Sequence, residues 1–113
     1  MEGVRIVQLT DIDDAEVAST FDRCWQDTEP SVLMHGPQGL RRVSSWLDVS
    51  PRSSALLYER SRPVGVILTA LRDPNRGYIA SLAVDPDFRG KGYGRRLMQW
   101  GLVRARTAGC RKV

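Results

Sequence analysis

Cysteines and long apolar runs are scarce in this chain. Its 113 residues include two cysteines, Cys24 and Cys110, whose separation fits no metal-binding or redox motif. We interpret both as free thiols of a cytoplasmic protein, because a reducing compartment disfavours disulfides. No 18 consecutive residues are apolar, and the first residues lack the basic head and apolar run of a secretory signal. We therefore expect no membrane span, no disulfide and no metal site.

Acidic residues are missing from the last part of the chain. The range 89–113 contains eight lysines and arginines and no acid, whereas the range 11–29 contains seven acids. The net charge is +4. A basic end suits an anionic ligand, and charge alone leaves nucleic acid open as one such partner. The motifs described below make nucleic acid the less favoured alternative. If the chain did bind DNA or RNA, its affinity for them would fall steeply with salt concentration.

Hydrophobic periodicity predicts a single domain, 1–113, with both helices and strands. Apolar residues at helical spacing place Trp25, Trp46 and Trp100 in the core. Turn-forming residues at 60–63 predict an antiparallel hairpin, and a second strong turn follows at 73–77. The expected helices cover 11–27, 40–50 and 95–108, and the expected strands cover 4–9, 54–59, 64–71 and 78–84, with the start of a further strand at 110–113.

The glycine-rich run Arg89-Gly90-Lys91-Gly92-Tyr93-Gly94 is the most informative motif. It lies between the strand that ends at Val84 and the helix expected to begin near Arg95. Glycines let backbone N–H groups converge without side chains between them. A helix N-terminus adds unpaired N–H donors and the positive end of its dipole. A strand, a glycine loop and a helix in this order predict a phosphate-binding site.

The spacing of the glycines separates several kinds of phosphate loop. A nucleotide-triphosphate loop requires Gly-Lys-Ser or Gly-Lys-Thr, which is absent, and the dinucleotide fingerprint Gly-x-Gly-x-x-Gly misses its third glycine by one position. An RNA-recognition strand can read Arg-Gly-x-Gly-Tyr, but residues 95–100 have a helical period. The pattern that fits is Arg-x-x-Gly-x-Gly between a strand and a long helix.

The segment 82–98, Leu-Ala-Val-Asp-Pro-Asp-Phe-Arg-Gly-Lys-Gly-Tyr-Gly-Arg-Arg-Leu-Met, resembles the acetyl-CoA signature of the GNAT N-acetyltransferase superfamily. The element order β-α-α-β-β-β-α, followed by the start of a strand, is also similar to that fold. The resemblance implies an α/β (α+β) fold with a mixed central sheet and helices on both faces. It also implies transfer of an acetyl group from acetyl-CoA to an amine, and it leaves the acceptor open among small amines, aminoglycoside-like compounds, protein N-termini and lysine side chains.

The resemblance further implies where acetyl-CoA binds. Backbone amides of the glycine loop would hold the pyrophosphate, and the side chains of Arg89 and Lys91 would add positive charge. The pantetheine arm would lie beside the last strand like an added strand, with backbone N–H groups facing the oxyanion of a tetrahedral intermediate. The cofactor-binding residues implied in this way are Leu82, Ala83, Val84, Arg89, Gly90, Lys91, Gly92, Tyr93, Gly94 and Arg95.

The catalytic residues stay unassigned. A lysine-like amine has a pKa of roughly 10.4, so only about one molecule in a thousand is neutral at pH 7, and a base or a water relay must take its proton. The family often places a glutamate on the strand before the loop, but Ala80 stands at that position here. The candidates near it are Tyr78, Ser81 and Asp85, and the more distant ones are Glu29, His35 and Glu59.

The family continues after this helix with a strand, a further helix and a closing hairpin, which this sequence does not contain. We therefore expect a fragment, or a chain whose sheet is completed by a partner, for example a homodimer formed by strand exchange. A second hypothesis is a catalytically incomplete GNAT-like module that acts by binding coenzyme A or a partner.

Overall fold

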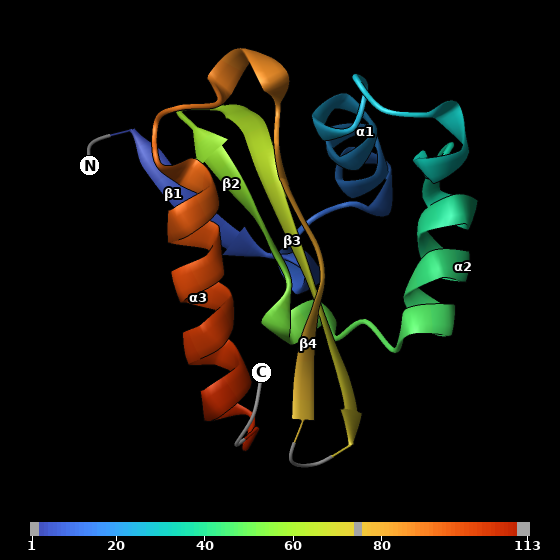
Figure 1. Ribbon diagram of the computed structural model, residues 1–113, viewed down its shortest axis with the longest axis vertical. Helices are drawn as coiled ribbons and strands as arrows, with labels where there is room; N and C mark the ends of the chain where they lie inside the picture. Colours follow the sequence, from blue (N-terminus) through green and yellow to red (C-terminus); the bar gives the residue numbers. More distant parts are fainter. Residues whose placement is uncertain (1–2, 74–75, 111–113) are drawn as a thin grey trace.

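The computed structural model describes residues 3–73 and 76–110, and it confirms the predicted order of helices and strands (Figure 1). Four strands form one sheet in the order β1-β2-β3-β4. All described neighbours are antiparallel, so the mixed character expected of the sheet is not seen among these four strands. Residues 111–113 of the expected further strand lie outside the described residues. The strands are β1 Val4–Gln8, β2 Ala55–Glu59, β3 Arg62–Asp73 and β4 Arg76–Val84.

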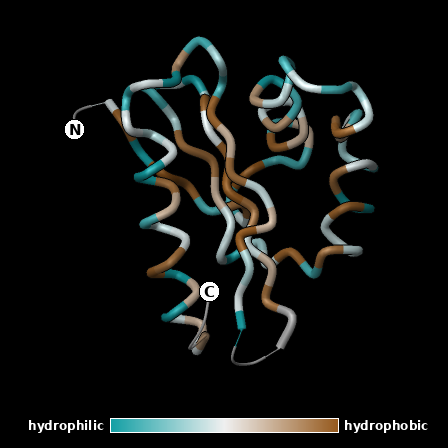
Figure 2. Tube along the Cα trace, in the orientation of Figure 1, coloured by the Kyte–Doolittle hydropathy of each residue, from teal (hydrophilic) through white to brown (hydrophobic). Residues whose placement is uncertain are grey.

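Helices cover both faces of the sheet, as expected. Helices α1 (Asp14–Cys24) and α2 (Pro37–Leu47) lie on one side, and α3 (Tyr93–Thr107) lies on the other (Figure 1). Each side has its own apolar cluster, the first around Phe21, Leu56 and Leu68 and the second around Leu57, Ile67 and Leu97. Figure 2 shows the central strands as the longest hydrophobic segments of the chain. Neighbouring residues such as Leu56 and Leu57 face opposite clusters because side chains alternate along a strand.

All three helices begin at other residues than the sequence predicts, and α2 covers Pro37–Leu47 where 40–50 was expected. Helix α1 begins at Asp14 because the carboxylate of Asp13 caps it, accepting a hydrogen bond from the backbone N–H of Ala15 at 2.7 Å. Helix α3 begins at Tyr93, two residues early, because Gly92 is its N-cap. Tyr93 and Gly94 therefore belong to the first helical turn and not to the loop.

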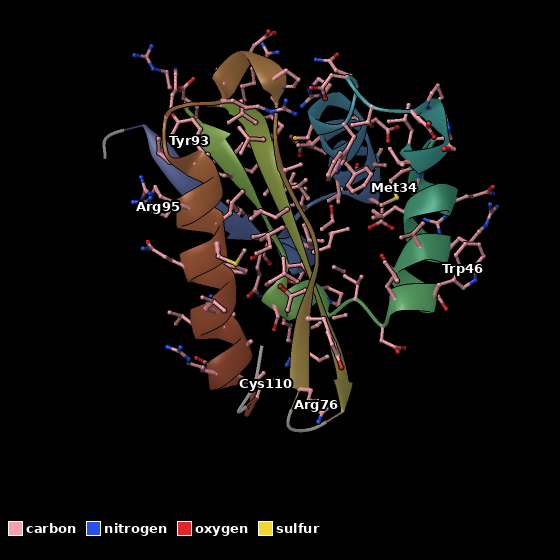
Figure 3. All side chains as sticks on the ribbon, viewed as in Figure 1. Met34, Trp46, Arg76, Tyr93, Arg95 and Cys110 are labelled. Carbon is pink, nitrogen blue, oxygen red and sulfur yellow. The ribbon has the colours of Figure 1, made fainter. Side chains whose placement is uncertain are left out.

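The prediction that Trp46 belongs to the core is wrong. Its side chain is 69% exposed on the outer face of α2 (Figure 3), whereas Leu40 on the same helix is 4% exposed. Since a helix turns about 100° per residue, Trp46 lies about 120° away from Leu40 around the axis, while Leu47 lies within about 20° of it. Trp25 and Trp100 are partly buried against the two clusters, as predicted.

Strand β4 contains a β-bulge in the middle of the segment that the site uses. Leu68 pairs with Ser81 and Thr69 pairs with Ile79, so Ala80 is an extra residue between them. Ala80 and Ser81 both face the α1–α2 side, whereas Leu82 packs in the α3 cluster. Strict alternation along a strand would place Ala80 and Leu82 on one face, and the bulge puts them on opposite faces.

Candidate functional site

A cavity of about 480 Å³ opens where β4 ends and α3 begins, and we call it the strand-end cavity. Its walls come from the end of β4, the glycine loop, the first turn of α3 and the residue that follows α1. The lining includes every residue expected to bind the cofactor except Lys91 and Arg95. The lining residues are Trp25, Leu82, Ala83, Val84, Phe88, Arg89, Gly90, Gly92, Tyr93 and Gly94.

Backbone geometry makes the loop side of this cavity a donor surface. Gly90 and Gly92 have φ values of +85° and +82°, a region that glycine enters without a steric penalty. The first bond of α3 runs from the N–H of Arg96 to the carbonyl of Gly92 at 3.2 Å. The N–H groups of the preceding residues in that turn have no acceptor within the helix. Together with the helix dipole, they favour an anion at this end of the cavity.

The side chain of Arg89 ties the loop to the end of α1. Its guanidinium donates to the backbone carbonyl of Val84 at 3.0 Å, to the carbonyl of Cys24 at 3.0 Å and to the carboxylate of Asp27 at 2.7 Å. The hydrogen bond from Arg89 holds the pKa of Asp27 below its usual value. The arginine charge expected near the phosphates is therefore paired with Asp27, and Arg89 positions the loop.

Glu59, at the end of β2, holds the other side chains of the loop. Its carboxylate accepts hydrogen bonds from the Tyr93 hydroxyl and from Lys91 Nζ, the latter at 3.1 Å. The bond from Tyr93 and then the one from Lys91 lower the pKa of Glu59, while the carboxylate raises the pKa of Tyr93. Arg95, in contrast, is exposed in the first turn of α3 (Figure 3). The side chains of Arg89 and Lys91 are thus engaged in ion pairs, whereas no ion pair of Arg95 is found among the described residues.

A second cavity, of about 200 Å³, lies between α1, α2 and β4, and we call it the helix-side cavity. Apolar side chains form nearly all of its lining, and Trp25 is a wall of both cavities. Because of the bulge, Ala80 and Ser81 both line it, one residue before the stretch of β4 that lines the strand-end cavity. The lining residues are Phe21, Trp25, Val32, Met34, Val43, Leu47, Leu68, Ala80 and Ser81.

The three candidate catalytic residues lie in different surroundings. Ser81 lines the helix-side cavity, whereas Tyr78, 45% exposed, is not among the residues that line either cavity. Asp85 is 1% exposed and also lies outside both linings. Its carboxylate accepts a hydrogen bond from the N–H of Asp87 at 3.0 Å and pairs with Arg62 at 3.8 Å. That geometry assigns Asp85 a part in holding the turn before the glycine loop.

The more distant candidates also lie away from the cavities. His35 is exposed, and its ring lies 3.2 Å from the carbonyl of Pro30. Glu59 is engaged with Lys91 and Tyr93, and Glu29 is exposed. In the described part of the chain, no carboxylate lines either of the two cavities.

Sequence reasoning missed Trp25 and Asp27 as parts of the site. Trp25 has the helical spacing of a core residue, and it does pack against Phe21, but it also separates the two cavities. Its indole N–H is buried with no hydrogen-bond partner within residues 3–73 and 76–110. Asp27 is 62 residues from Arg89, and nothing in either local sequence signals their pairing.

Metal-binding clusters and membrane-spanning helices were both searched for among the described residues. Within 3–73 and 76–110, no group of three or more histidine, cysteine, aspartate or glutamate side chains could hold a metal ion. No helix in that same part of the chain combines the length and apolar character needed to cross a membrane.

Residues 15–113 match the family model described as Acetyltransferase (GNAT) family, and the chain belongs to this family. Solved structures share its fold. An acetyltransferase from Trypanosoma brucei has a TM-score of 0.69 at 19% identity, covering 97% of this chain and 80% of that one. A GNAT family acetyltransferase from Brucella melitensis in complex with acetyl-CoA has a TM-score of 0.74 at 19% identity, with coverage of 98% and 73%.

A third similar structure is the NatC complex bound to Gag peptide and CoA. Its TM-score is 0.67 at 19% identity, covering 95% of this chain and 69% of that one. No curated protein sequence matches the chain.

Proposed function

We propose that this chain is an N-acetyltransferase domain, residues 1–113, that transfers an acetyl group from acetyl-CoA to an amine. The strand-end cavity carries the proposal, because it combines an anion-binding helix terminus with the edge of β4 in one space. Membership of the GNAT family supports it. The structures of similar proteins crystallised with acetyl-CoA or CoA support the choice of cosubstrate.

The residues of the cavity have separate tasks in this proposal. Backbone N–H groups of residues 89–95 hold the pyrophosphate, and Arg95 adds a charge from the exposed side. Leu82, Ala83 and Val84 offer an apolar strand surface to the pantetheine arm. Arg89 and Glu59 keep the loop in this shape through their contacts with Asp27, Lys91 and Tyr93.

The proposed reaction is a direct transfer. The amine nitrogen attacks the thioester carbonyl carbon, the carbon–sulfur bond breaks, and coenzyme A leaves as a thiolate that takes up a proton. The proton lost by the amine passes to water, since no carboxylate lines either cavity in the described part of the chain. Without a local base the neutral amine is reached at a cost of about 4 kcal/mol, so turnover should rise with pH toward the amine pKa.

A catalytically incomplete module that binds coenzyme A is the second candidate. The observation that favours it is Ala80 in place of a carboxylate, together with the lack of a carboxylate in the lining of either cavity within the described residues. Coenzyme A binding without release of free thiol from acetyl-CoA, over a panel of amines and up to pH 9, would select this candidate.

Calorimetric titration with coenzyme A tests the site, using a matched pair of variants. Gly90→Asp and Gly90→Asn add side chains of nearly equal shape, and the space around a Cβ at Gly90 is open. Asn and Asp both tolerate a positive φ, so the pair differs mainly in charge. We expect the aspartate variant to bind coenzyme A at least tenfold more weakly than the asparagine variant. Equal affinities, or no binding by the unmodified chain at millimolar ligand, would refute the site.

Location and assembly are also part of the proposal. The two cysteines are free and buried, which suits a reducing cytoplasm.

In the described part of the chain β4 pairs only with β3, and a second copy of the chain would cover its other edge by strand exchange. Sedimentation velocity that gives a monomer at every concentration would contradict this homodimer.

A further inference from the structure

The helix-side cavity has the character of a specificity pocket. Eight of its nine lining residues are apolar, and Ser81 supplies the one hydroxyl. We propose that it binds an uncharged apolar group of the amine acceptor, about as large as a leucine or methionine side chain. This inference rests on the proposed acetyl transfer and names the class of acceptor for that same site.

The position of the cavity relative to the strand-end cavity supports the proposal. The two spaces share the indole of Trp25 and are lined by successive residues of β4, with Ser81 on one side and Leu82 on the other. One residue of a strand spans about 3.3 Å. An acceptor with its apolar group in the helix-side cavity would therefore present an adjacent amine at the boundary between the two spaces.

The lining offers nothing to a charged group. The nearby carboxylate of Asp22 already accepts hydrogen bonds from the backbone N–H groups of Met34 at 2.6 Å and His35 at 3.2 Å. Those bonds fix the loop that brings Met34, 4% exposed, into the wall of the cavity. Burial of an unpaired ammonium against such a lining is strongly unfavourable. The acidic residues at the start of the chain therefore do not make this cavity a site for a cationic acceptor.

The size of the cavity sets the size of the group. An apolar cavity of about 150 Å³ in another protein holds benzene, and this one measures about 200 Å³. A branched four-carbon side chain or a phenyl ring fits that volume, while a hydrogen atom in the same place leaves it empty. The bulge in β4 matters here, because it brings two small residues, Ala80 and Ser81, to the same wall.

Three amides of the same backbone test the proposal: leucinamide, glycinamide and lysinamide. Their binding is measured by ligand-observed saturation-transfer NMR, with and without coenzyme A, and their acetylation by mass spectrometry. We expect leucinamide to bind roughly tenfold to hundredfold more tightly than glycinamide, the range that one buried side chain supplies. Lysinamide should bind no better than glycinamide.

Three variants test whether the preference arises in this cavity. Ala80→Leu fills the cavity from β4 and should abolish the advantage of leucinamide, while Ala15→Leu makes the same change at an exposed position on α1 and should keep it. Leu47→Ala enlarges the cavity from α2 and should shift the preference toward phenylalaninamide. Coenzyme A affinity should survive in all three variants, which also reports that they are folded.

Different results contradict different parts of the argument. Failure of coenzyme A to bind contradicts the proposed function, while the order of amide affinities in the free chain still decides the cavity. Equal affinities for leucinamide and glycinamide, or a preference for lysinamide, overturn the apolar pocket. An unchanged leucinamide preference in Ala80→Leu overturns its assignment to this cavity.

Discussion

Glycines within the same loop have different roles at the level of single residues. Gly92 caps α3 with a φ of +82°, a conformation that costs an L-residue energy through its Cβ. Gly94 lies inside the first helical turn, and a Cβ there would meet Val84 Cγ2 at 3.8 Å, an ordinary contact distance. The three glycines of the motif look equivalent in the sequence, and only the backbone angles separate them.

Alanine substitutions should make this difference measurable. We expect Gly92→Ala to lower the free energy of unfolding by about 1–2 kcal/mol, because it forces alanine into the left-handed region. Gly94→Ala should raise it by roughly 0.5–1 kcal/mol, since alanine loses less backbone entropy in a helix. Urea titrations followed by circular dichroism measure both values. Two variants of equal stability would show that Gly92 has no conformational role.

Single side chains also show the limit of periodicity. Both Trp25 and Trp46 occur near apolar neighbours at helical spacing, yet Trp46 is exposed and Trp25 divides two cavities. The spacing of α2 does predict its buried residue, Leu40. What separates an inner from an outer tryptophan is its angle around the helix, and the packing of neighbouring elements decides how wide the buried stripe is.

At the level of elements, Arg89 joins the glycine loop to the end of α1. The guanidinium has four hydrogen bonds, to the Val84 and Cys24 carbonyls and to both carboxylate oxygens of Asp27. Three of these four acceptor atoms, those of Cys24 and Asp27, lie at the end of α1 and in the segment after it, which are far from the loop in sequence. The arginine of the motif therefore acts as a brace between elements in this chain.

The brace should depend on pH through Asp27. Arg89 lowers the pKa of folded Asp27 below its unfolded value of 3.8, so the contribution to stability is complete above that pH and is lost as the pH falls through the folded pKa. We expect Asp27→Asn to be less stable than the parent chain at pH 7 and the gap to close below pH 3.8. Unfolding free energies from pH 7 to pH 2.5 measure it.

The matched control for that series is Glu29→Gln. It removes an exposed carboxylate two residues further along the same segment. Its stability relative to the parent chain should change little between the two ends of the pH range. A gap for Asp27→Asn that stays constant down to pH 2.5 would mean that its ion pair with Arg89 contributes nothing.

The elements were predicted better than their details. Alternation and helical spacing give the order of four strands and three helices, since those patterns follow directly from which faces are buried. The bulge at Ala80 was not foreseen, because a bulge depends on the partner strand and leaves no local mark. The same holds for the early start of α3, where the positive φ of Gly92 decides between loop and helix.

The candidate site was also predicted in its location but not in its side-chain contacts. The strand-end cavity contains eight of the ten residues that the signature implies, since a glycine loop after a strand defines its own geometry. The ion-pair partners of Arg89 and Lys91 could not be predicted from the local sequence, because the carboxylates that they contact lie 62 and 32 residues away in the chain. The helix-side cavity is lined by residues of α1, α2, β3, β4 and the segment between the two helices, so no single segment of the sequence predicts it.

At the level of the whole molecule, the sheet separates two apolar layers, and both cysteines are buried. Cys24 is 0% exposed on the α1 side, and Cys110 is 5% exposed beyond the end of α3. Burial, followed by the nearby Asp85 carboxylate, raises the pKa of Cys24 from 9.0 to about 12. At pH 8 its reactive thiolate form is about one part in ten thousand.

Thiol reactivity should therefore report global unfolding. We expect dithionitrobenzoate at pH 8 to react with neither cysteine of the native protein within minutes and with both in urea. The urea concentration at which the thiols become reactive should equal the unfolding midpoint measured by circular dichroism. A Cys110→Ala variant reports the reactivity of Cys24 alone. Rapid reaction of Cys24 below that midpoint would reveal local opening of the α1 layer.

The shared wall at Trp25 has a consequence for energetics. Trp25 lines both cavities, so a shift of its ring caused by a ligand in one cavity would alter the space offered to a ligand in the other. Such coupling between sites is reciprocal by thermodynamic linkage. If coenzyme A changes the affinity for an amine by some factor, the amine must change the affinity for coenzyme A by the same factor. A single tryptophan, Trp25, would transmit this coupling between the two cavities.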